Sequence, residues 1–340
     1  MLNIFIKSYN RAYYLDRCIN SIFQNVSGNY TVIILDDGTP KKYLEKIQQI
    51  YPSVKVICSG NYEAKSISVE QNISNGKPID SMKIPTDMWM EQVKKSDDYI
   101  LMTEDDVWFT KKIDIDEVIS SMESHKIQLV RLGWLGNFKD DYNLKIEKIS
   151  NLLDRTVPKK LFTSNHFVMD VYMYNKYKAF SILKKLKLAN KSTKLQYWAI
   201  NSILMGLYHK DYWLYIWKDA YGKVDEKQQL RNAAVWFHKY KKNKNLIART
   251  HQEYMKTTFK SSSTNSYHQY GFEFDVNYFN YTMNEAWLHG KFDSIQNYPQ
   301  DFSTDYFERF FDEKLNKDEF RKWIEKFKLQ YKNNGANVEE

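Results

Sequence analysis

Short apolar runs alternate with amphipathic segments through the first part of the chain. Four runs, bounded by polar residues, predict strands at Leu2–Ile6, Tyr30–Leu35, Val54–Ile57 and Tyr99–Met102. Between them apolar residues recur at helical spacing, for example at Leu15, Cys18 and Ile22, which predicts intervening helices. Strand–helix alternation at this spacing is typical of an α/β fold with a largely parallel sheet and right-handed crossovers.

The pattern continues less regularly to residue 225. It predicts helices at Met88–Lys95, Ile113–Met122, Lys176–Leu186 and Lys194–Leu207, strands at Ile127–Leu132, Phe167–Tyr174 and Tyr212–Trp217, and a charged, irregular surface excursion over 137–160. Beyond Asp225 it predicts a helix at Glu226–Asn245 and a helix pair within Tyr306–Tyr331. We therefore expect an α/β domain over residues 1–225 and a mostly helical extension over 226–340 that packs on it.

Polar residues follow three of the predicted strands at the point where each strand ends. They form the segments Lys7-Ser8-Tyr9-Asn10-Arg11, Asp36-Asp37-Gly38 and Glu104-Asp105-Asp106. In open parallel sheets, ligands bind beyond the carboxyl ends of the strands. We therefore expect these three loops to converge on one binding site.

The three adjacent carboxylates need a counter-charge, because neighbouring negative charges repel one another and resist removal from water. Hard oxygen ligands at a strand end suit Mg²⁺ or Mn²⁺, ions that are usually shared with a phosphate-bearing substrate. A solvated acidic turn is the alternative interpretation. Lys7 and Arg11 can offset phosphate charge. Asp37 can accept a hydrogen bond from a ring nitrogen of uracil or guanine, although Asp37-Gly38 alone also suits an ordinary turn.

The 340 residues carry a formal net charge of +8, which favours an anionic partner such as a nucleotide sugar, an anionic lipid surface or nucleic acid. The two cysteines, Cys18 and Cys58, form no metal or disulfide motif, which suits a reducing cytosol. The apolar run before Lys7 is too short for a signal peptide, and no segment approaches a membrane span. GxSxG, P-loop and GxGxxG motifs are absent from the sequence, which argues against hydrolases, kinases and Rossmann dehydrogenases.

Three sequence blocks resemble the opening of a nucleotide-sugar glycosyltransferase of the GT-A fold: FIKSYNRAYYLDRCINSI, VIILDDGTP and ILMTEDDVWF. The first two are similar to the family-2 pattern. The Glu-Asp-Asp form of the third is similar to the metal motif of N-acetylglucosaminyltransferase I. The likeness covers residues 1–112 well and 113–225 faintly, and it does not extend to the last hundred residues.

This resemblance implies a Rossmann-like GT-A fold, a nucleoside-diphosphate sugar as donor and Mn²⁺ or Mg²⁺ as cofactor. It implies that Asp106 is the main direct metal ligand and a catalytic residue, with Glu104 and Asp105 on the ribose, the diphosphate or metal-bound waters. Asp37, with Asp36, would hold the base. The other donor-site candidates are Lys7, Ser8, Asn10 and Arg11 in the first loop and Lys83 before the fourth strand, which is a solvated surface lysine in the alternative interpretation.

Two positions depart from the family pattern. Inverting members usually carry an acidic base at the start of the helix expected at Lys194–Leu207, but Gln196 stands there, and glutamine cannot accept a proton at neutral pH. Many members also carry a histidine metal ligand where this chain has Ala220-Tyr221-Gly222-Lys223. A retaining transferase would not need the base. Otherwise the nearby candidates for it are Asp170, Asp219, Asp225 and Glu226.

We therefore expect a metal-dependent glycosyltransferase, with a UDP-sugar favoured as donor and a glycan or lipid-linked hydroxyl as acceptor. Three alternatives stay open: a nucleotidyltransferase of similar fold, a catalytically inactive glycan-binding module, and a transferase acting on modified nucleic acid. The first usually has a glycine-rich loop after the first strand, which Lys7–Arg11 lacks. The expected location is the cytoplasm, with a possible peripheral contact to the inner face of the membrane. The lysine-rich aromatic helices within Tyr306–Tyr331 suit such a contact, but packing on the domain is the simpler explanation.

Overall fold

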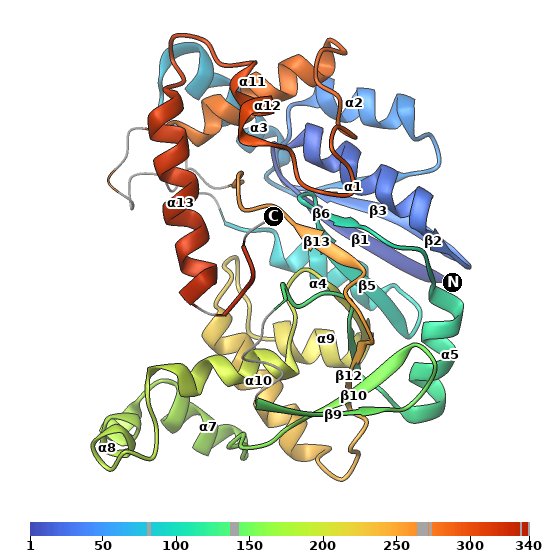
Figure 1. The fold of residues 1–340 in the computed structure, drawn as a ribbon, viewed down its shortest axis with the longest axis vertical. Coiled ribbons are helices and arrows are strands. Elements are labelled where there is room, and N and C mark those ends of the chain that lie inside the picture. Colours follow the sequence, from blue (N-terminus) through green and yellow to red (C-terminus); the bar gives the residue numbers. More distant parts are fainter. Residues whose placement is uncertain (80–82, 137–142, 264–270, 272–273, 334, 339–340) are drawn as a thin grey trace.

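A computed structural model describes residues 1–79, 83–136, 143–263, 271, 274–333 and 335–338. A large sheet runs through the molecule, with helices on both of its faces (Figure 1). The helices of the C-terminal part lie beside those of the N-terminal part, although they are far apart in the sequence.

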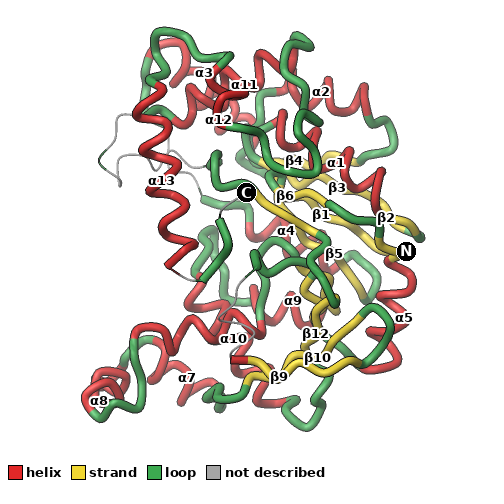
Figure 2. The backbone as a smooth tube through the Cα atoms, in the orientation of Figure 1, coloured by secondary structure: helices red, strands yellow, loops and turns green. Residues whose placement is uncertain are grey.

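Within the described residues, nine strands form the main sheet. Their order is β4 (Lys55–Cys58), β3 (Tyr30–Asp36), β1 (Leu2–Ser8), β5 (Tyr99–Glu104), β11 (Gly206–His209), β8 (Leu129–Arg131), β12 (Ile247–Thr250), β10 (Leu153–Pro158) and β9 (Leu144–Lys148) (Figure 2). The first four strands of this order are parallel, as are β8 and β12, whereas β11, β10 and β9 pair antiparallel with their neighbours. Ile4 of β1 lies opposite Val32 of β3 and Leu101 of β5, so the carboxyl ends of these strands meet at one edge.

Side chains alternate across the sheet and divide the interior into two apolar cores. In β1, Ile4 and Ile6 enter one core and Phe5 enters the other. The first core is covered by α1 (Ala12–Asn25), α2 (Lys41–Ile50), α3 (Tyr62–Asn75), α5 (Ile115–His125), α11 (Val276–Leu288), α12 (Thr304–Glu308) and α13 (Lys317–Asn333). The second is covered by α4 (Thr86–Lys94), α7 (His166–Met173), α8 (Ala179–Lys185), η2 (Lys191–Ile200), α9 (Lys210–Trp217) and α10 (Glu226–Lys239). The short 3₁₀ helix η1 (Lys176–Lys178), between α7 and α8, buries no residue. In the part of the chain that the structure describes, no helix is both long and apolar enough to cross a membrane.

These elements confirm the predicted α/β class, with a mostly parallel sheet flanked by helices and with helices at the C-terminal end. The expected N-terminal strands all form, and β1, β3 and β5 run one or two residues further than their apolar cores predict. Their last residues are polar because they enter the loops at the sheet edge.

The main sheet does not end at residue 225, where we expected the first domain to stop. β12 comes from residues 247–250 and lies between β8 and β10. A small second sheet pairs β13 (Met255–Thr257) with β6 (Val107–Phe109), and another pairs β2 (Val26–Ser27) with β7 (Ile113–Asp114). Residues beyond 225 are therefore part of the α/β body as well as of its helical cover.

Two expected strands in the middle of the chain are helices. The run at Phe167–Tyr174 forms α7, and the run at Tyr212–Trp217 forms α9. Asn165 caps α7 by accepting the N–H of Val168 over 3.1 Å, and the His209 side chain caps α9. A short apolar run suits a buried strand or a buried helix, and the caps favour the helix here.

The segments around them also differ from expectation. The predicted helix Lys194–Leu207 is divided between the 3₁₀ helix η2, which ends at Ile200, and the strand β11. Residues 143–158 of the expected surface excursion instead form β9 and β10, which extend the sheet edge and bury Leu144 and Leu153; residues 137–142 lie outside the described part.

The C-terminal helices pack directly against α1. The carboxylate of Asp16 accepts hydrogen bonds from Trp287 Nε1 over 2.7 Å and from the Ser294 hydroxyl over 2.5 Å. On α13, Phe320 and Trp323 are fully buried in the first core. Packing on the domain therefore explains the aromatic periodicity of this helix.

Candidate active site

The three polar loops converge at the carboxyl edge of β1, β3 and β5, where they line a cavity of about 590 Å³. The loops contribute Lys7, Ser8, Tyr9, Arg11, Asp37, Glu104 and Asp105. The opposite wall includes Lys65 from α3, Trp89 from α4, and Asn277 and Asn280 from α11. A cavity of this size suits a small-molecule ligand or cofactor.

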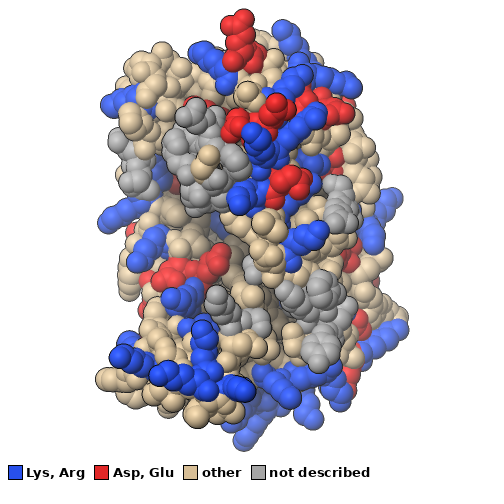
Figure 3. Space-filling model, turned by 60° about the vertical axis from the view of Figure 1, so that its left-hand side comes forward, with Lys and Arg blue, Asp and Glu red and all other residues tan. Residues whose placement is uncertain are grey.

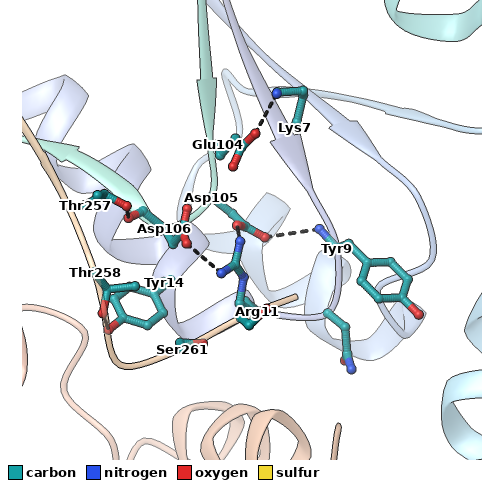
Figure 4. Close-up of polar contacts among 12 residues, drawn as sticks. Lys7, Tyr9, Arg11, Tyr14, Glu104, Asp105, Asp106, Thr257, Thr258 and Ser261 are labelled. Atoms are coloured by element: carbon teal, nitrogen blue, oxygen red, sulfur yellow. Dashed lines mark hydrogen bonds and ion pairs between the residues drawn. The ribbon is translucent and has the colours of Figure 1, made fainter. Parts of the chain in front are cut away.

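Each carboxylate of the Glu104-Asp105-Asp106 cluster is paired with a cation from the end of β1 or from the loop that follows it (Figure 4). Lys7 Nζ donates to Glu104 Oε1 over 2.6 Å. Arg11 lies between the two aspartates and donates to Asp105 Oδ1 and, over 2.6 Å, to Asp106 Oδ2. The backbone N–H of Tyr9 donates to Asp105 Oδ2 over 3.1 Å. The cluster is therefore not a solvated turn, because Asp105 and Asp106 are buried and held by Arg11.

Burial dominates the electrostatics of this cluster. Burial raises the pKa of Asp105 to about 7, although Arg11 acts in the opposite direction. Burial also raises the pKa of Asp106, again opposed by Arg11. Burial alone would lower the pKa of Arg11, but Asp105 and Asp106 outweigh it and raise that pKa above its usual value. The cluster thus holds a proton-sensitive carboxyl group beside a permanent cation.

Asp37 follows β3 at the cavity wall and pairs with a lysine that our sequence analysis did not identify. Lys65 of α3 donates to Asp37 Oδ2 and, over 2.8 Å, to the carbonyl oxygen of Lys83. The other carboxylate oxygen, Asp37 Oδ1, is buried without a hydrogen-bond partner. Burial raises the pKa of Asp37, and the hydrogen bond from Lys65 opposes that shift. A ligand N–H could satisfy this buried acceptor.

Lys65 was missed because α3 itself was missed. Its apolar positions do not form a clear stripe: Tyr62 and Val69 are buried, whereas Ile67 is half exposed. The main sequence signal is Gly76, which ends the helix in the left-handed conformation with φ of 69°.

Asp36 and Asn10 are buried beside the cavity without lining it. Asp36 accepts the N–H groups of Gly38 and Thr39 and the Thr39 hydroxyl, so it shapes the turn after β3. Gly38 has a φ of 134°, which residues with a side chain rarely adopt. The N–H of Asn10 donates to Thr39 Oγ1 over 2.8 Å. These two predicted site residues therefore join the loops that carry the cavity wall.

A row of asparagines on α11 binds the loop after β1 to the C-terminal part. Asn277 accepts from Asn10 Nδ2 over 2.8 Å, and Asn284 Nδ2 donates to the carbonyl oxygen of Asn10 over 3.0 Å. Asn280 accepts from the Tyr13 hydroxyl over 3.0 Å. The spacing of these asparagines places them near one face of a helix. That signal was available in the sequence, but the family resemblance does not reach this region.

Asp106, the expected metal ligand, does not form part of the cavity wall. The described residues contain no group of three His, Cys, Asp or Glu side chains that could hold a metal ion. However, Asp106 Oδ1 is buried without a hydrogen-bond partner, and in Figure 4 the oxygen that does not bind Arg11 points away from it. A nucleotide-bound Mg²⁺ needs only one or two carboxylates, with phosphate oxygens and waters completing its shell. Asp106 and Glu104 are two carboxylates at and just beyond the end of β5.

Gln196 lies away from this cavity. It lines a separate apolar cavity of about 410 Å³ between α7, α8 and η2, together with Phe162, Leu183 and Tyr197. The structure thus does not bring Gln196 together with the acidic cluster.

The four acidic alternatives to Gln196 also lie outside the wall of the cavity of about 590 Å³. Asp170 and Asp219 both pair with Arg231, at 3.4 and 3.1 Å. Asp225 caps α10 by accepting the N–H of its third residue over 3.1 Å. Glu226 begins the same helix, and burial, followed by the charge of Asp225, raises its pKa. Glu226 is two residues beyond Val224, which does line the cavity.

Lys83 is exposed and does not line the cavity, where Lys65 takes the wall position instead. The N–H of Ile84, the next residue, donates to the carbonyl oxygen of Gly222 over 2.9 Å. The Thr86 hydroxyl donates to the carbonyl oxygen of Ala220, also over 2.9 Å. The loop that lacks the family histidine therefore packs against the segment before α4.

Comparison with known proteins finds a family match for the first part of the chain. Residues 3–75 match the model of Glycosyl transferase family 2. A search of curated proteins found no match. Similar solved structures include residues 1–349 of S. aureus TarS, with 13% identity and a TM-score of 0.41 over 93% of this chain and 71% of that chain. The same TarS segment in complex with UDP-GlcNAc has 12% identity and a TM-score of 0.42 over 93% and 72%.

A further solved structure is glucosyl-3-phosphoglycerate synthase from Mycobacterium tuberculosis in complex with Mn²⁺, UDP and phosphoglyceric acid. It has 10% identity and a TM-score of 0.38 over 86% of this chain and 80% of that chain. The family match itself covers β1, β3 and α3, which carry Lys7, Arg11, Asp37 and Lys65 of the cavity wall. Residues 3–75 of this chain, with the cavity residues that they carry, are therefore similar to glycosyl transferase family 2.

Proposed function

We propose that the protein is a glycosyltransferase that uses a nucleoside-diphosphate sugar, with a UDP-sugar favoured, and a divalent cation. Its acceptor is a hydroxyl group of a glycan or a lipid-linked saccharide. The observation that carries the proposal is the cavity at the carboxyl edge of β1, β3 and β5. There Asp37, which has a carboxylate oxygen without a hydrogen-bond partner, lines the same space as the paired cations Lys7 and Arg11.

Asp37 is the proposed contact for the base. Its Oδ1 atom is a buried acceptor with no partner, and the ring N–H of uracil is a donor that matches it. Lys65 holds the carboxylate from its other oxygen, which fixes the orientation of the acceptor. Trp89 and Ile84 supply apolar wall nearby.

The charge of the cavity wall supports the need for a cation. Among the described lining residues, Lys7, Arg11 and Lys65 are balanced by Asp37, Glu104 and Asp105. A bound diphosphate would therefore lie against a wall with no net positive charge to balance its own negative charge. Asp106 Oδ1 and Glu104 are the proposed ligands of Mn²⁺ or Mg²⁺, which when bound would stabilise the leaving diphosphate as a Lewis acid.

In the proposed transfer, an acceptor hydroxyl oxygen forms a bond to the anomeric carbon of the sugar. The bond between that carbon and the diphosphate oxygen breaks, and its electron pair stays on the diphosphate. Arg11 and Lys7 hold the acidic cluster in place while charge develops at the leaving group. The proton of the acceptor passes to a general base, for which Asp170, Asp219, Asp225 and Glu226 are the candidates, or to the leaving group itself if configuration is retained.

The test is a hydrolysis and transfer screen of UDP-, GDP- and CDP-sugars, with Mn²⁺, Mg²⁺ or EDTA, in which the released diphosphate is identified. We expect release of UDP in the presence of metal and its loss with EDTA. At a donor concentration below saturation, the Asp37→Asn variant should show much less of this activity than the parent, whereas Asp98→Asn, which changes an exposed carboxylate elsewhere, should retain it. Release of a different diphosphate would overturn the donor assignment, and undiminished activity in EDTA would overturn the metal assignment.

A further inference from the structure

The charge of the chain is concentrated in one segment. Residues 159–194 contain nine lysines and one acidic residue, Asp170, and so carry a net charge of +8. Because the whole chain has 50 basic and 42 acidic residues, the rest of it contains 41 of each and is neutral. We call residues 159–194, which include α7, η1 and α8, the basic lobe.

The basic lobe lies at one end of the molecule. Figure 1 shows α7 and α8 at the lower left, away from the C-terminal helices. In Figure 3, Lys and Arg side chains gather along the lower part of the molecule. Lys178, Lys184, Lys185 and Lys187 are exposed, and in the described part of the chain no acidic side chain forms an ion pair with any of these four.

Large apolar side chains are exposed on the same lobe. Fourteen large hydrophobic residues are exposed in the described chain, and six of them fall in this segment of 36 residues. They are Phe162, Phe167, Tyr177, Ile182, Leu186 and Leu188. Leu186 and Leu188 are 62% and 71% exposed and alternate with exposed lysines along the chain. Water is a poor solvent for such a surface.

We infer that the basic lobe binds the surface of an anionic lipid bilayer. Lysines interleaved with exposed leucine, isoleucine and aromatic side chains match a surface that offers negative headgroups above an apolar interior. A soluble polyanion would satisfy the lysines but would leave the apolar side chains in water. A second copy of this chain that docked through its own lobe would bring a charge of +8 against a charge of +8 and be repelled.

The test is binding of the full chain to vesicles, measured by co-sedimentation. The probes are vesicles of phosphatidylglycerol and phosphatidylcholine in equal parts, and vesicles of phosphatidylcholine alone. We expect binding to the anionic vesicles that weakens as salt is added, and little binding to the neutral ones. This readout does not depend on transferase activity, so it separates this inference from the proposed function.

The charge variant is the triple change Lys184→Gln, Lys185→Gln and Lys187→Gln. It should bind anionic vesicles about a hundredfold more weakly, because each lysine near an anionic surface contributes about a fivefold factor. The matched control removes three exposed lysines from α2 and α13, as Lys41→Gln, Lys317→Gln and Lys326→Gln, and should bind like the parent. Equal losses in the two triple variants would overturn the inference, as would failure of the parent to bind.

The apolar variant is the double change Leu186→Ser and Leu188→Ser. These side chains are exposed, so circular dichroism and thermal unfolding should match the parent. We expect weaker vesicle binding at unchanged charge. If this variant binds anionic vesicles as tightly as the parent, the lobe is a site for a soluble polyanion and the inference fails. The same conclusion follows if polyphosphate displaces the parent and this variant from vesicles equally well. The inference also fails if sedimentation shows a dimer that this variant dissociates.

Discussion

Arg11 and Asp106 are joined by a hydrogen bond of 2.6 Å in the interior of the protein, where Arg11 is 4% and Asp106 is 9% exposed. The same guanidinium group binds Asp105, so one cation compensates two buried carboxylates. Stability and site chemistry therefore depend on the same three side chains.

Replacing Arg11 with methionine should destabilise the fold strongly. The change leaves Asp105 and Asp106 buried without their cation, and breaking such a pair typically costs about 3–5 kcal/mol. Urea denaturation at neutral pH measures the loss in free energy of unfolding. Adding Asp105→Asn to this variant should recover part of it, because one orphaned charge is removed. A loss as small as that of the exposed-charge variant Asp98→Asn would contradict the role of Arg11.

The Asp106→Asn variant should fold but lose metal-dependent donor binding. Arg11 keeps Asp105 as a partner, so the interior retains a balanced pair, whereas the anionic oxygen proposed for the metal is gone. Calorimetric titration of UDP with and without Mn²⁺ separates the two effects. If Mn²⁺ strengthens UDP binding equally in the variant and the parent, Asp106 is not a metal ligand.

The Asp37→Asn variant should weaken nucleotide binding more than it slows turnover, because the base contact exists before and during the transition state. Hydrogen bonds to a charged group contribute roughly 1.5–3 kcal/mol, so we expect about a tenfold to hundredfold loss of UDP affinity. Asparagine keeps the size of the side chain beside Lys65. Titrations of UDP and GDP on both proteins test this, and unchanged UDP binding would remove Asp37 from the base site.

Stability should fall with rising pH through the titration of Asp105. Its pKa in the folded protein, about 7, lies above the ordinary value of 3.8, so between these values the folded state holds a proton that the unfolded state has lost. The contribution of this proton to the free energy of unfolding is fully present below the ordinary pKa of 3.8. It is lost as the pH rises through the folded-state pKa of about 7. Thermal unfolding across this range should show a shallower pH slope in Asp105→Asn than in the parent. Parallel slopes would show that Asp105 does not titrate in this way.

Gln196→Ala should leave the rate of sugar transfer close to that of the parent, because Gln196 lines a separate apolar cavity away from the acidic cluster. Loss of a true general base typically costs about 10² to 10⁴ in rate. Amide variants of Asp170, Asp219, Asp225 and Glu226 should be compared with it, alongside the anomeric configuration of the product. An inverted product with one variant slowed by that full factor identifies the base. A retained product with none so affected indicates a mechanism without an enzymic base.

The N-terminal half of the site was predictable because its signals are local. An apolar strand followed directly by polar residues marks a sheet edge, and three such junctions placed Lys7, Arg11, Asp37, Glu104 and Asp105 on one cavity. The same reasoning could not distinguish Asp36 from Asp37. The structure of the turn shows that Asp36 accepts the N–H groups of Gly38 and Thr39, whereas Asp37 lines the cavity.

The rest of the site depends on tertiary contacts that leave weak marks in the sequence. Lys65 sits on a helix without a clear apolar stripe, and Asn277 and Asn280 come from a region outside the family resemblance. The middle of the chain was misassigned because its short apolar runs are buried as helices as readily as strands. Gln196 was assigned to the position of the family's base from that incorrect secondary structure. The structure has α7, η2 and α9 in this region instead.

The hydrogen bond between Asn10 and Asn277 joins residues that are 267 positions apart in the chain. A chain emerging from the ribosome therefore completes β1, β3 and β5 long before the helix that supplies the facing wall. Until α11 arrives, the loop after β1 lacks its asparagine partners and the donor cavity has one side open to solvent. Nascent chains released before this point should be unable to retain a nucleotide, so that binding competence is acquired late and in a single step of synthesis.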